Sequence, residues 1–251
     1  METITSRQNP LFQKIRKLNA SNAFRRQQGL FVCEGPKLLE EAVKWGASIE
    51  LAVKTPGFEL PQGLVCRVVE TPGDVLPSLA DTKTPQKVVF ACALPDTVLP
   101  ERLEGGRYLV LDGVQDPGNM GTIWRTADAF GARGLILTGN CGEPFAPKAV
   151  RASMGACFRL PVWRGERQAV AEVLAASEIP LYATALREDT VEVGTVDLSG
   201  AAVVIGSEGK GISEEMLTLC GKTLKIPMVE RCESLNAAVA AAVVLWEGWR
   251  K

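Results

Sequence analysis

Hydrophobic positions in the first part of the chain predict a small domain of strands and helices. Residues 5 to 28 carry Leu11, Ile15 and Leu18 at helical spacing among basic and polar residues, which predicts a helical segment. Residues 36 to 46 predict another helix, because they begin with proline and end with glycine. Short apolar runs predict strands at residues 29–35, 49–55, 66–70 and 87–94.

The second part of the chain alternates more regularly between apolar runs and helical patterns. Predicted strands lie at residues 108–112, 134–138, 180–184, 201–206 and 222–227. One predicted helix follows the first of these strands and ends near Phe130. The other predicted helices span residues 144–156, 166–178, 213–220 and 234–249, and Ser213 is the N-cap of the third of these four. This alternation predicts a mostly parallel sheet that helices cover on both faces.

Residues 95 to 107 separate the two parts, since they are rich in proline, glycine and charge and show no apolar periodicity. We therefore predict one domain at residues 1–96, a linker at 97–106 and a second domain at 107–251.

The 251-residue chain has a net charge of −1, so the whole molecule does not attract polyanions. Its first 28 residues nevertheless hold Arg7, Lys14, Arg16, Lys17, Arg25 and Arg26 against the single acid Glu2. Such a cluster indicates either a surface for a polyanion or a solvated helix face, and charge alone leaves both open.

The absence of histidine restricts the possible chemistry. It excludes Ser-His-Asp and Cys-His nucleophiles and nearly every zinc site, so we expect no metal. The seven cysteines include no C-x-x-C pair, which favours buried free thiols in a reducing compartment. Residues 1–20 lack the apolar core of a signal peptide, and the longest apolar run, 237–246, falls short of the roughly 18 residues that cross a membrane. We expect a cytoplasmic protein.

Three loops each follow a predicted strand and precede a helix, at residues 113–121, 206–211 and 227–234. In open α/β sheets such loops gather outside the carboxyl ends of the strands and form ligand sites. The middle loop, "GSEGKGIS", has neither P-loop nor G-x-G-x-x-G spacing. Two interpretations remain. Its glycines allow the backbone beside Glu208 to approach a ligand closely, or the segment is simply a surface turn.

The first and third loops carry polar residues, within them or just after them, that also have a purely structural interpretation. Asn119 could cap its helix, and Arg125 lies about 200° around that helix from Ile123, away from the apolar face. If Arg125 is covered, it needs an anionic or carbonyl partner, for which Glu208 is a candidate, and otherwise it reaches solvent. Ser234 is a plausible N-cap, with Asn236 just inside the last helix.

Together the three segments resemble the signature motifs of the SpoU (TrmH-type) branch of SPOUT RNA methyltransferases. They read "DPGNMGTIWRTADAFGA", "VVIGSEGKGIS" and "LKIPMVERCESLNAAVAAAVVLW", in the family's order, over residues 107 to 249. The N-terminal "SRQNPLFQKIRKL" and "GLFVCEGPKLLEEAV" are similar to the RNA-binding domain that often precedes this catalytic domain.

The resemblance implies an enzyme that transfers a methyl group from S-adenosylmethionine to a ribose 2′-hydroxyl of rRNA or tRNA. It implies an α/β fold with a deep trefoil knot, a mostly parallel sheet, and a small α/β RNA-binding domain before it. Without this resemblance, a knot would not be considered, because knotted chains are very rare among protein folds. The resemblance also implies a homodimer whose site lies at the subunit interface.

The resemblance assigns roles to residues that match the motifs. The implied catalytic set is Asn119, Arg125, Glu208, Ser234 and Asn236. The implied cofactor contacts are backbone groups around Leu137, Thr138, Gly206, Ile226, Met228, Ser234 and Leu235. The six basic residues of the first 28 become the expected RNA-binding surface.

Two departures from the family pattern are present. Val229, Glu230, Arg231 and Cys232 stand where small residues are common, and Ala237 and Ala238 replace the usual Val and Ser. Two other functions remain open at this point: a non-catalytic RNA-binding protein of the same fold, and a nucleotide-dependent α/β enzyme.

For the chemistry, a guanidinium resists deprotonation, so we favour an orienting and electrostatic role for Arg125 over a role as base.

Overall fold

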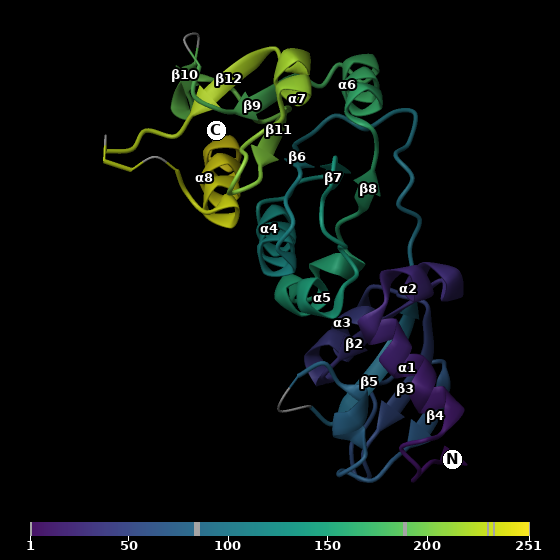
Figure 1. The fold of residues 1–251 in the computed structure, drawn as a ribbon. Coiled ribbons are helices and arrows are strands. Elements are labelled where there is room, and N and C mark those ends of the chain that lie inside the picture. The colour runs from purple at the N-terminus through teal and green to yellow at the C-terminus, as the bar shows by residue number, and fades with distance from the viewer. Residues whose placement is uncertain (1, 83–85, 188–189, 230, 233, 251) are drawn as a thin grey trace. The chain divides into compact units, whose positions relative to one another are not determined.

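The computed structural model describes residues 2–82, 86–187, 190–229, 231–232 and 234–250 of the chain (Figure 1). The chain forms two compact units. Unit 1 comprises Met1–Pro95 and Phe145–Phe158, and unit 2 comprises Asp96–Pro144 and Arg159–Lys251. The domain boundaries predicted from the sequence stay a prediction, and the structure adds that Phe145–Phe158 packs within unit 1.

Unit 1 is built on a mixed sheet with strand order β1-β4-β3-β5-β2. The strands are β1 (Glu2–Thr3), β2 (Leu30–Glu34), β3 (Ile49–Lys54), β4 (Arg67–Glu70) and β5 (Val88–Ala93). Strand β5 runs antiparallel to both β2 and β3, whereas β4 runs parallel to β3 and β1.

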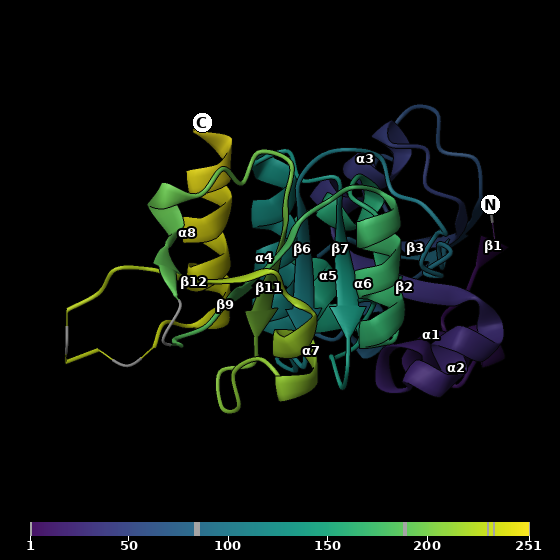
Figure 2. The same ribbon diagram turned by 90° about the horizontal axis from the view of Figure 1, so that it is seen from above.

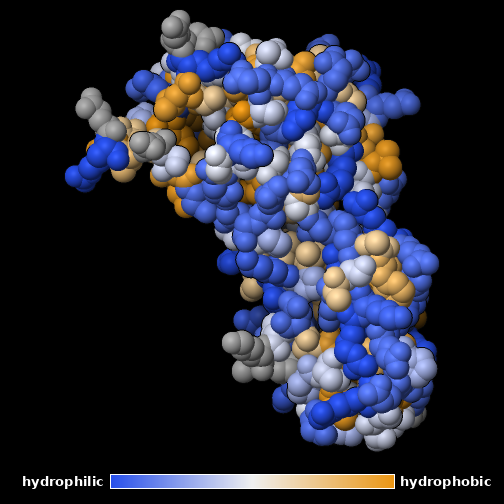
Figure 3. Space-filling model, viewed as in Figure 1, coloured by the Kyte–Doolittle hydropathy of each residue, from blue (hydrophilic) through white to orange (hydrophobic). Residues whose placement is uncertain are grey.

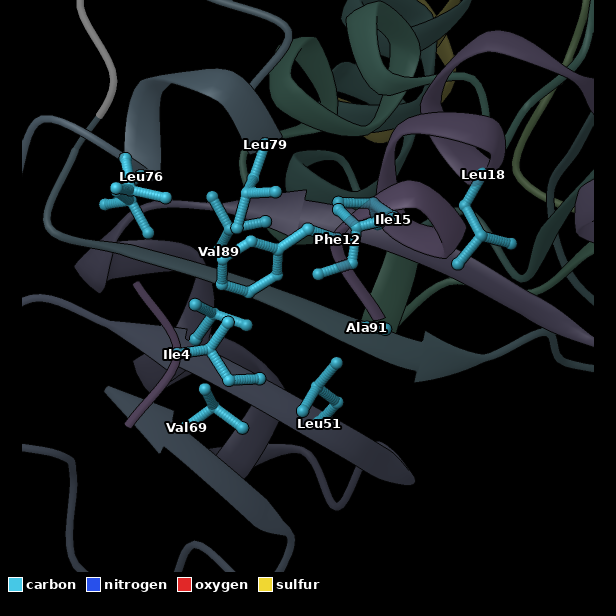
Figure 4. Packing of buried hydrophobic residues seen from close by; sticks show 13 residues of the cluster. Ile4, Phe12, Ile15, Leu18, Leu51, Val69, Leu76, Leu79, Val89 and Ala91 are labelled. Carbon is cyan, nitrogen blue, oxygen red and sulfur yellow. The ribbon is translucent and has the colours of Figure 1, made fainter. Parts of the chain in front are cut away.

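The helices of unit 1 are α1 (Pro10–Ala20), α2 (Asn22–Gln28), α3 (Pro36–Lys44) and α5 (Pro147–Ser153), with short 3-10 turns at Leu76–Leu79 and Ala156–Phe158. The basic stretch thus forms two helices, because Ser21 is extended and its hydroxyl accepts from Phe24 N. Helix α1 buries Phe12, Ile15 and Leu18 against the sheet (Figure 4).

Unit 2 is built on a sheet with strand order β10-β12-β9-β11-β6-β7-β8, in which every pairing is parallel. Its strands are β6 (Tyr108–Asp112), β7 (Gly134–Thr138), β8 (Val162–Arg164), β9 (Leu181–Thr184), β10 (Val191–Glu192), β11 (Ala202–Gly206) and β12 (Lys222–Lys225). Its helices are α4 (Pro117–Ala129), α6 (Arg167–Ala176), α7 (Glu214–Leu219) and α8 (Ala237–Trp249), with a 3-10 turn at Val193–Thr195.

Helices cover both faces of the unit 2 sheet (Figure 2). Tyr108, Val110 and Val204 face the side on which α6 and α7 pack. Alternate residues of the same strands face α4 and α8, which lie side by side. The predicted mostly parallel α/β fold is confirmed, and the trefoil knot stays a prediction. Within the described ranges, no helix is both long and apolar enough to cross a membrane.

Candidate active site

A cavity of about 400 Å³ opens at the carboxyl edge of three neighbouring strands in unit 2. The chain segments that follow β9, β11 and β12 line it, and the start of α8 closes it. Its lining includes Gly206, Ile226, Met228, Ser234 and Leu235. This is the position at which open parallel sheets bind ligands, and the volume falls within the roughly 300–1,000 Å³ of small-molecule sites.

The loop after β11 forms one wall of this cavity and folds back tightly on itself. Ser207 and Gly211 exchange two backbone hydrogen bonds, of 3.0 and 2.9 Å, so that Glu208 stands at the tip. A Cβ at Gly206 would lie 2.3 Å from the carbonyl carbon of Gly211, so only glycine fits there without moving the loop. Gly211 adopts a φ of +65°, which favours glycine as well.

Side chains from the three motif segments meet in one hydrogen-bonded chain. The Asn236 amide donates to Asn119 Oδ1 at 3.1 Å, and the Asn119 amide donates to the Glu208 carboxylate. These contacts join α8, α4 and the loop after β11. The structure therefore brings together three of the five predicted catalytic residues.

The helix caps differ from those considered from the sequence. Asp116 caps α4 by accepting from Asn119 N at 2.8 Å, so Asn119 lies inside the helix with its side chain available for other contacts. Asn236, not Ser234, caps α8, and it accepts from Ala238 N at 2.9 Å. Ser234 lies exposed before the helix and lines the cavity.

Arg125 lies apart from this hydrogen-bonded chain. It is exposed on α4, and in the described part of the chain it makes no hydrogen bond or ion pair. Six residues along a helix correspond to about 9 Å and a rotation of about 240°, so Arg125 and Asn119 face different directions. Glu208, the candidate partner of a covered Arg125, binds Asn119 instead.

The predicted cofactor contacts fall into two groups. Gly206, Ile226, Met228, Ser234 and Leu235 line the cavity. Leu137 and Thr138 are buried in β7, which β6 separates from β11. The Thr138 hydroxyl donates to Asp112 Oδ1 at 3.1 Å, and the Thr138 carbonyl accepts from Gly113 N at 3.2 Å. A cofactor role for these two residues stays a prediction.

Of the segment that departs from the family pattern, Glu230 lies outside the described residues. Its neighbours Val229, Arg231 and Cys232 are exposed. Ala237 and Ala238 are buried in the first turn of α8, as expected for helix packing.

Sequence reasoning missed Asp112, which ends β6 directly before the first motif loop. Its side chain is 2% exposed and lies 2.9 Å from the Arg167 guanidinium. Burial alone would raise the pKa of Asp112, but hydrogen bonds from Ser213 and the pairing with Arg167 outweigh it and lower the pKa. An Asp at a strand end was the available signal, but its partner Arg167 is distant in the sequence.

The predicted RNA-binding residues are only partly at the surface. Arg7, Arg26 and Lys17 are exposed, and Lys14 and Arg16 are half-buried. Arg25 is 4% exposed, and its guanidinium donates to the carbonyls of Leu18 and Asn19 at the end of α1. That side chain satisfies backbone groups at a helix terminus, which disfavours an RNA contact by Arg25, and the RNA-binding role of the other basic residues stays a prediction.

The fold is that of an α/β protein, and the position of the cavity is that of a ligand site at the carboxyl edge of a parallel sheet. The chain matches the model of the SpoU rRNA Methylase family over residues 106–246 and that of the MRM3-like substrate binding domain over residues 9–90. The chain belongs to the SpoU rRNA methylase family, and the resemblance inferred from the motifs is confirmed.

Full-length relatives support this assignment. The chain is 32% identical to the 23S rRNA (guanosine(2553)-2′-O)-methyltransferase RlmP of Bacillus subtilis (strain 168), over 98% of each chain. It is 33% identical to the 23S rRNA (uridine(2479)-2′-O)-methyltransferase of Streptomyces viridochromogenes, over 99% of this chain and 92% of the relative. The AdoMet-bound rRNA methyltransferase from Sinorhizobium meliloti has a TM-score of 0.89 at 32% identity, covering 99% of this chain and 97% of its own.

Proposed function

We propose that the protein transfers a methyl group from S-adenosylmethionine to a ribose 2′-hydroxyl of ribosomal RNA. The observation that carries the proposal is the meeting of Asn236, Asn119 and Glu208 beside the cavity. Two relatives that match over more than nine-tenths of their length are named as 23S rRNA 2′-O-methyltransferases.

The cavity suits the cofactor chemically. Apolar side chains such as Leu224, Ile226 and Leu235 line it beside the backbone of Gly206, a combination typical of sites for planar, partly apolar ligands. The Glu208 carboxylate at its edge complements a positively charged sulfonium. When bound, the cofactor supplies an activated methyl group.

The protein's own task is to align the ribose oxygen and to stabilise the charge that develops as its proton leaves. Arg125 performs the electrostatic part, since its guanidinium stays protonated and presents a fork of donors to oxygen atoms. Asn119, itself held by Asn236, holds Glu208 at the cavity, where its carboxylate, a phosphate or water receives the proton.

For this role Arg125 has to reach a cavity that binds the cofactor and ribose, and the cavity of a second copy of the chain is one that it can reach. Helices α4 and α8 run side by side in the same direction, because Asn119 meets Asn236 at their starts and Phe130 meets Trp246 at their ends. Arg125 is exposed on α4. Helix α8 exposes Val239, Trp246 and Trp249, each about half accessible.

An exposed apolar face of this kind is typical of an interface. Figure 3 shows hydrophobic surface on the part of unit 2 where Figure 1 places α8. We therefore infer a homodimer in which this face is covered and Arg125 of one subunit serves the site of the other.

Unit 1 supplies RNA affinity in this proposal. Its match to a substrate-binding domain and the exposed basic residues of α1 and α2 support a surface that contacts phosphates. All seven cysteines are free, which supports a cytoplasmic location.

Calorimetry with S-adenosylmethionine tests the proposal, with ATP and NAD as controls. We expect S-adenosylmethionine alone to bind, at a stoichiometry of one per chain. A chain that binds RNA but not S-adenosylmethionine would be a non-catalytic RNA-binding protein, and binding of ATP or NAD would point to a nucleotide-dependent enzyme.

A further inference from the structure

Both ends of the loop that carries Glu208 are attached to one residue, Asp112. At the start of the loop, Gly206 is the register partner of Asp112 in the parallel ladder of β11 and β6. At its end, Ser213 N donates to Asp112 Oδ2 at 2.8 Å. The backbone and the side chain of Asp112 thus close the base of the loop.

The same residue begins the loop that leads to Asn119. Because Asn119 in turn donates to Glu208, the contacts form a closed ring. The ring runs from Asp112 along the chain to Asn119, across to Glu208, along the chain to Ser213, and back to Asp112. A displacement of Asp112 would therefore shift two motif loops together.

The buried Asp112 carboxylate is fixed by an ion pair with the half-buried Arg167. The Arg167 Nε lies 2.9 Å from Asp112 Oδ1, and its Nη1 lies 3.0 Å from Glu215 Oε2. Arg167 is the first residue of α6, where the helix dipole disfavours a cation, so the helix itself gives no reason for an arginine there.

The neighbouring backbone leaves room for this ion pair. Gly139 has a φ of +58°, and a Cβ at that position would lie 2.3 Å from Arg167 Nη2 and 3.1 Å from Asp112 Oδ1. The chain after β7 is therefore compatible with the pair only because it carries glycine at this point.

We propose that the Asp112–Arg167 pair is a positioning element of the methyltransferase site, which holds the Glu208 loop against the cavity and in register with Asn119. Asp112 does not line the cavity, so it acts through the loop, whose residues Gly206, Ser207, Glu208, Lys210, Gly211 and Ile212 do. This inference rests on the proposed function of the site.

The test compares Asp112→Asn with a matched control, Asp128→Asn. Asp128 also pairs with an arginine of unit 2, at 2.7 Å from Arg159, but it has no contact with the motif loops among the bonds described. Each variant is measured for thermal stability, for hydrogen exchange in residues 207–212, for S-adenosylmethionine affinity and for single-turnover methyl transfer.

We expect Asp112→Asn to exchange faster in this loop and to lose up to about 100-fold in methyl transfer, because small displacements of reacting groups are costly. Asp128→Asn should keep its loop exchange and its rate within about twofold even where its melting temperature falls. If Asp112→Asn were as destabilised as the control but kept wild-type loop exchange and cofactor affinity, the inference would be wrong.

A second variant covers the case in which Asp112→Asn does not fold. Arg167→Gln leaves the carboxylate and its bond to Ser213 N in place, and we expect the same faster exchange. Wild-type exchange in Arg167→Gln would overturn the inference. A wild-type protein without methyl transfer would contradict the proposed function instead, and the exchange measurement would still decide the role of the pair.

Discussion

Arg125 and Asn119 lie on one helix, six residues apart, in different surroundings. Asn119 is fixed between Asn236 and Glu208, whereas Arg125 is exposed and without a partner in the described part of the chain. A long, exposed arginine carries a high entropic cost of ordering, so we propose that Arg125 acts only when RNA or a second subunit fixes it.

Replacing Arg125 with lysine tests whether the planar fork matters. Lysine keeps the charge but cannot contact two oxygens in one plane. We expect single-turnover methyl transfer by Arg125→Lys to fall by about 100-fold or more, comparable to the loss of one transition-state donor. Arg133→Lys, at a surface arginine paired with Glu104, is the control. Near wild-type rates for Arg125→Lys would exclude a role for the fork.

Gly206 and Gly209 form a matched pair within one loop. A Cβ at Gly206 would collide with the Gly211 backbone, whereas a Cβ at Gly209 meets nothing within 4 Å. We expect Gly206→Ala to lower stability by about 1–3 kcal/mol, the typical cost of overpacking, and to weaken S-adenosylmethionine binding because the loop is displaced, whereas Gly209→Ala should bind as wild type. Equal affinities of the two variants in calorimetry would contradict this account of the loop.

The motif residues could be predicted from the sequence because short, fixed spacings identify them. Their contacts could not be predicted, because residues distant in the sequence make them. Asp112 meets Arg167 and Ser213 only through the sheet, and the interior role of Arg25 depends on how α2 packs beneath the end of α1. Burial of a charged side chain leaves no local pattern in the chain.

Helices and long strands followed the hydrophobic pattern closely, and the short elements did not. Strands β1, β8 and β10 were missed, since two or three residues are too few to show alternation. The basic stretch was predicted to be helical, and it is divided at Ser21, whose side chain caps the second helix. Local capping chemistry therefore decided what periodicity alone could not.

The two basic helices, together with Arg7 just before α1, offer a test at the level of these elements. We expect replacement of Arg7, Lys14, Arg16, Lys17 and Arg26 by glutamine to weaken RNA binding and to reduce its salt dependence by about one unit of slope for each lost phosphate contact.

Arg25→Gln is the control for this set. Because the Arg25 guanidinium binds backbone carbonyls inside unit 1, its loss should lower the melting temperature and leave the salt slope unchanged. Unchanged RNA affinity in the variant with all five substitutions would refute the assignment of this surface to RNA binding.

At the scale of the whole molecule, the oligomeric state depends on what covers the exposed apolar face of α8. This helix is apolar on nearly all sides, and Phe130, Trp246 and Trp249 gather at its end with ring centroids 5.5 to 6.2 Å apart. An amphipathic surface helix would instead turn charged residues outward. The proposed dimer explains the apolar outer face and the position of Arg125 together.

A charge placed on this face should separate the subunits. Buried aromatic residues at interfaces commonly contribute 2 kcal/mol or more, so we expect Trp246→Glu to weaken dimerisation by about 30-fold or more. Light scattering would then show a monomer at concentrations at which the wild type is dimeric. Trp45→Glu, at an exposed tryptophan of unit 1, should remain dimeric. A monomeric wild type would refute the dimer.

The position of the transferred methyl group tests the central claim most directly. The protein is incubated with ribosomal RNA and S-adenosylmethionine that carries a labelled methyl group, and the RNA is then hydrolysed in alkali. A methylated 2′-oxygen cannot attack its phosphate, so the account predicts label in alkali-resistant dinucleotides. Label confined to mononucleotides, or absent from the RNA, would contradict it.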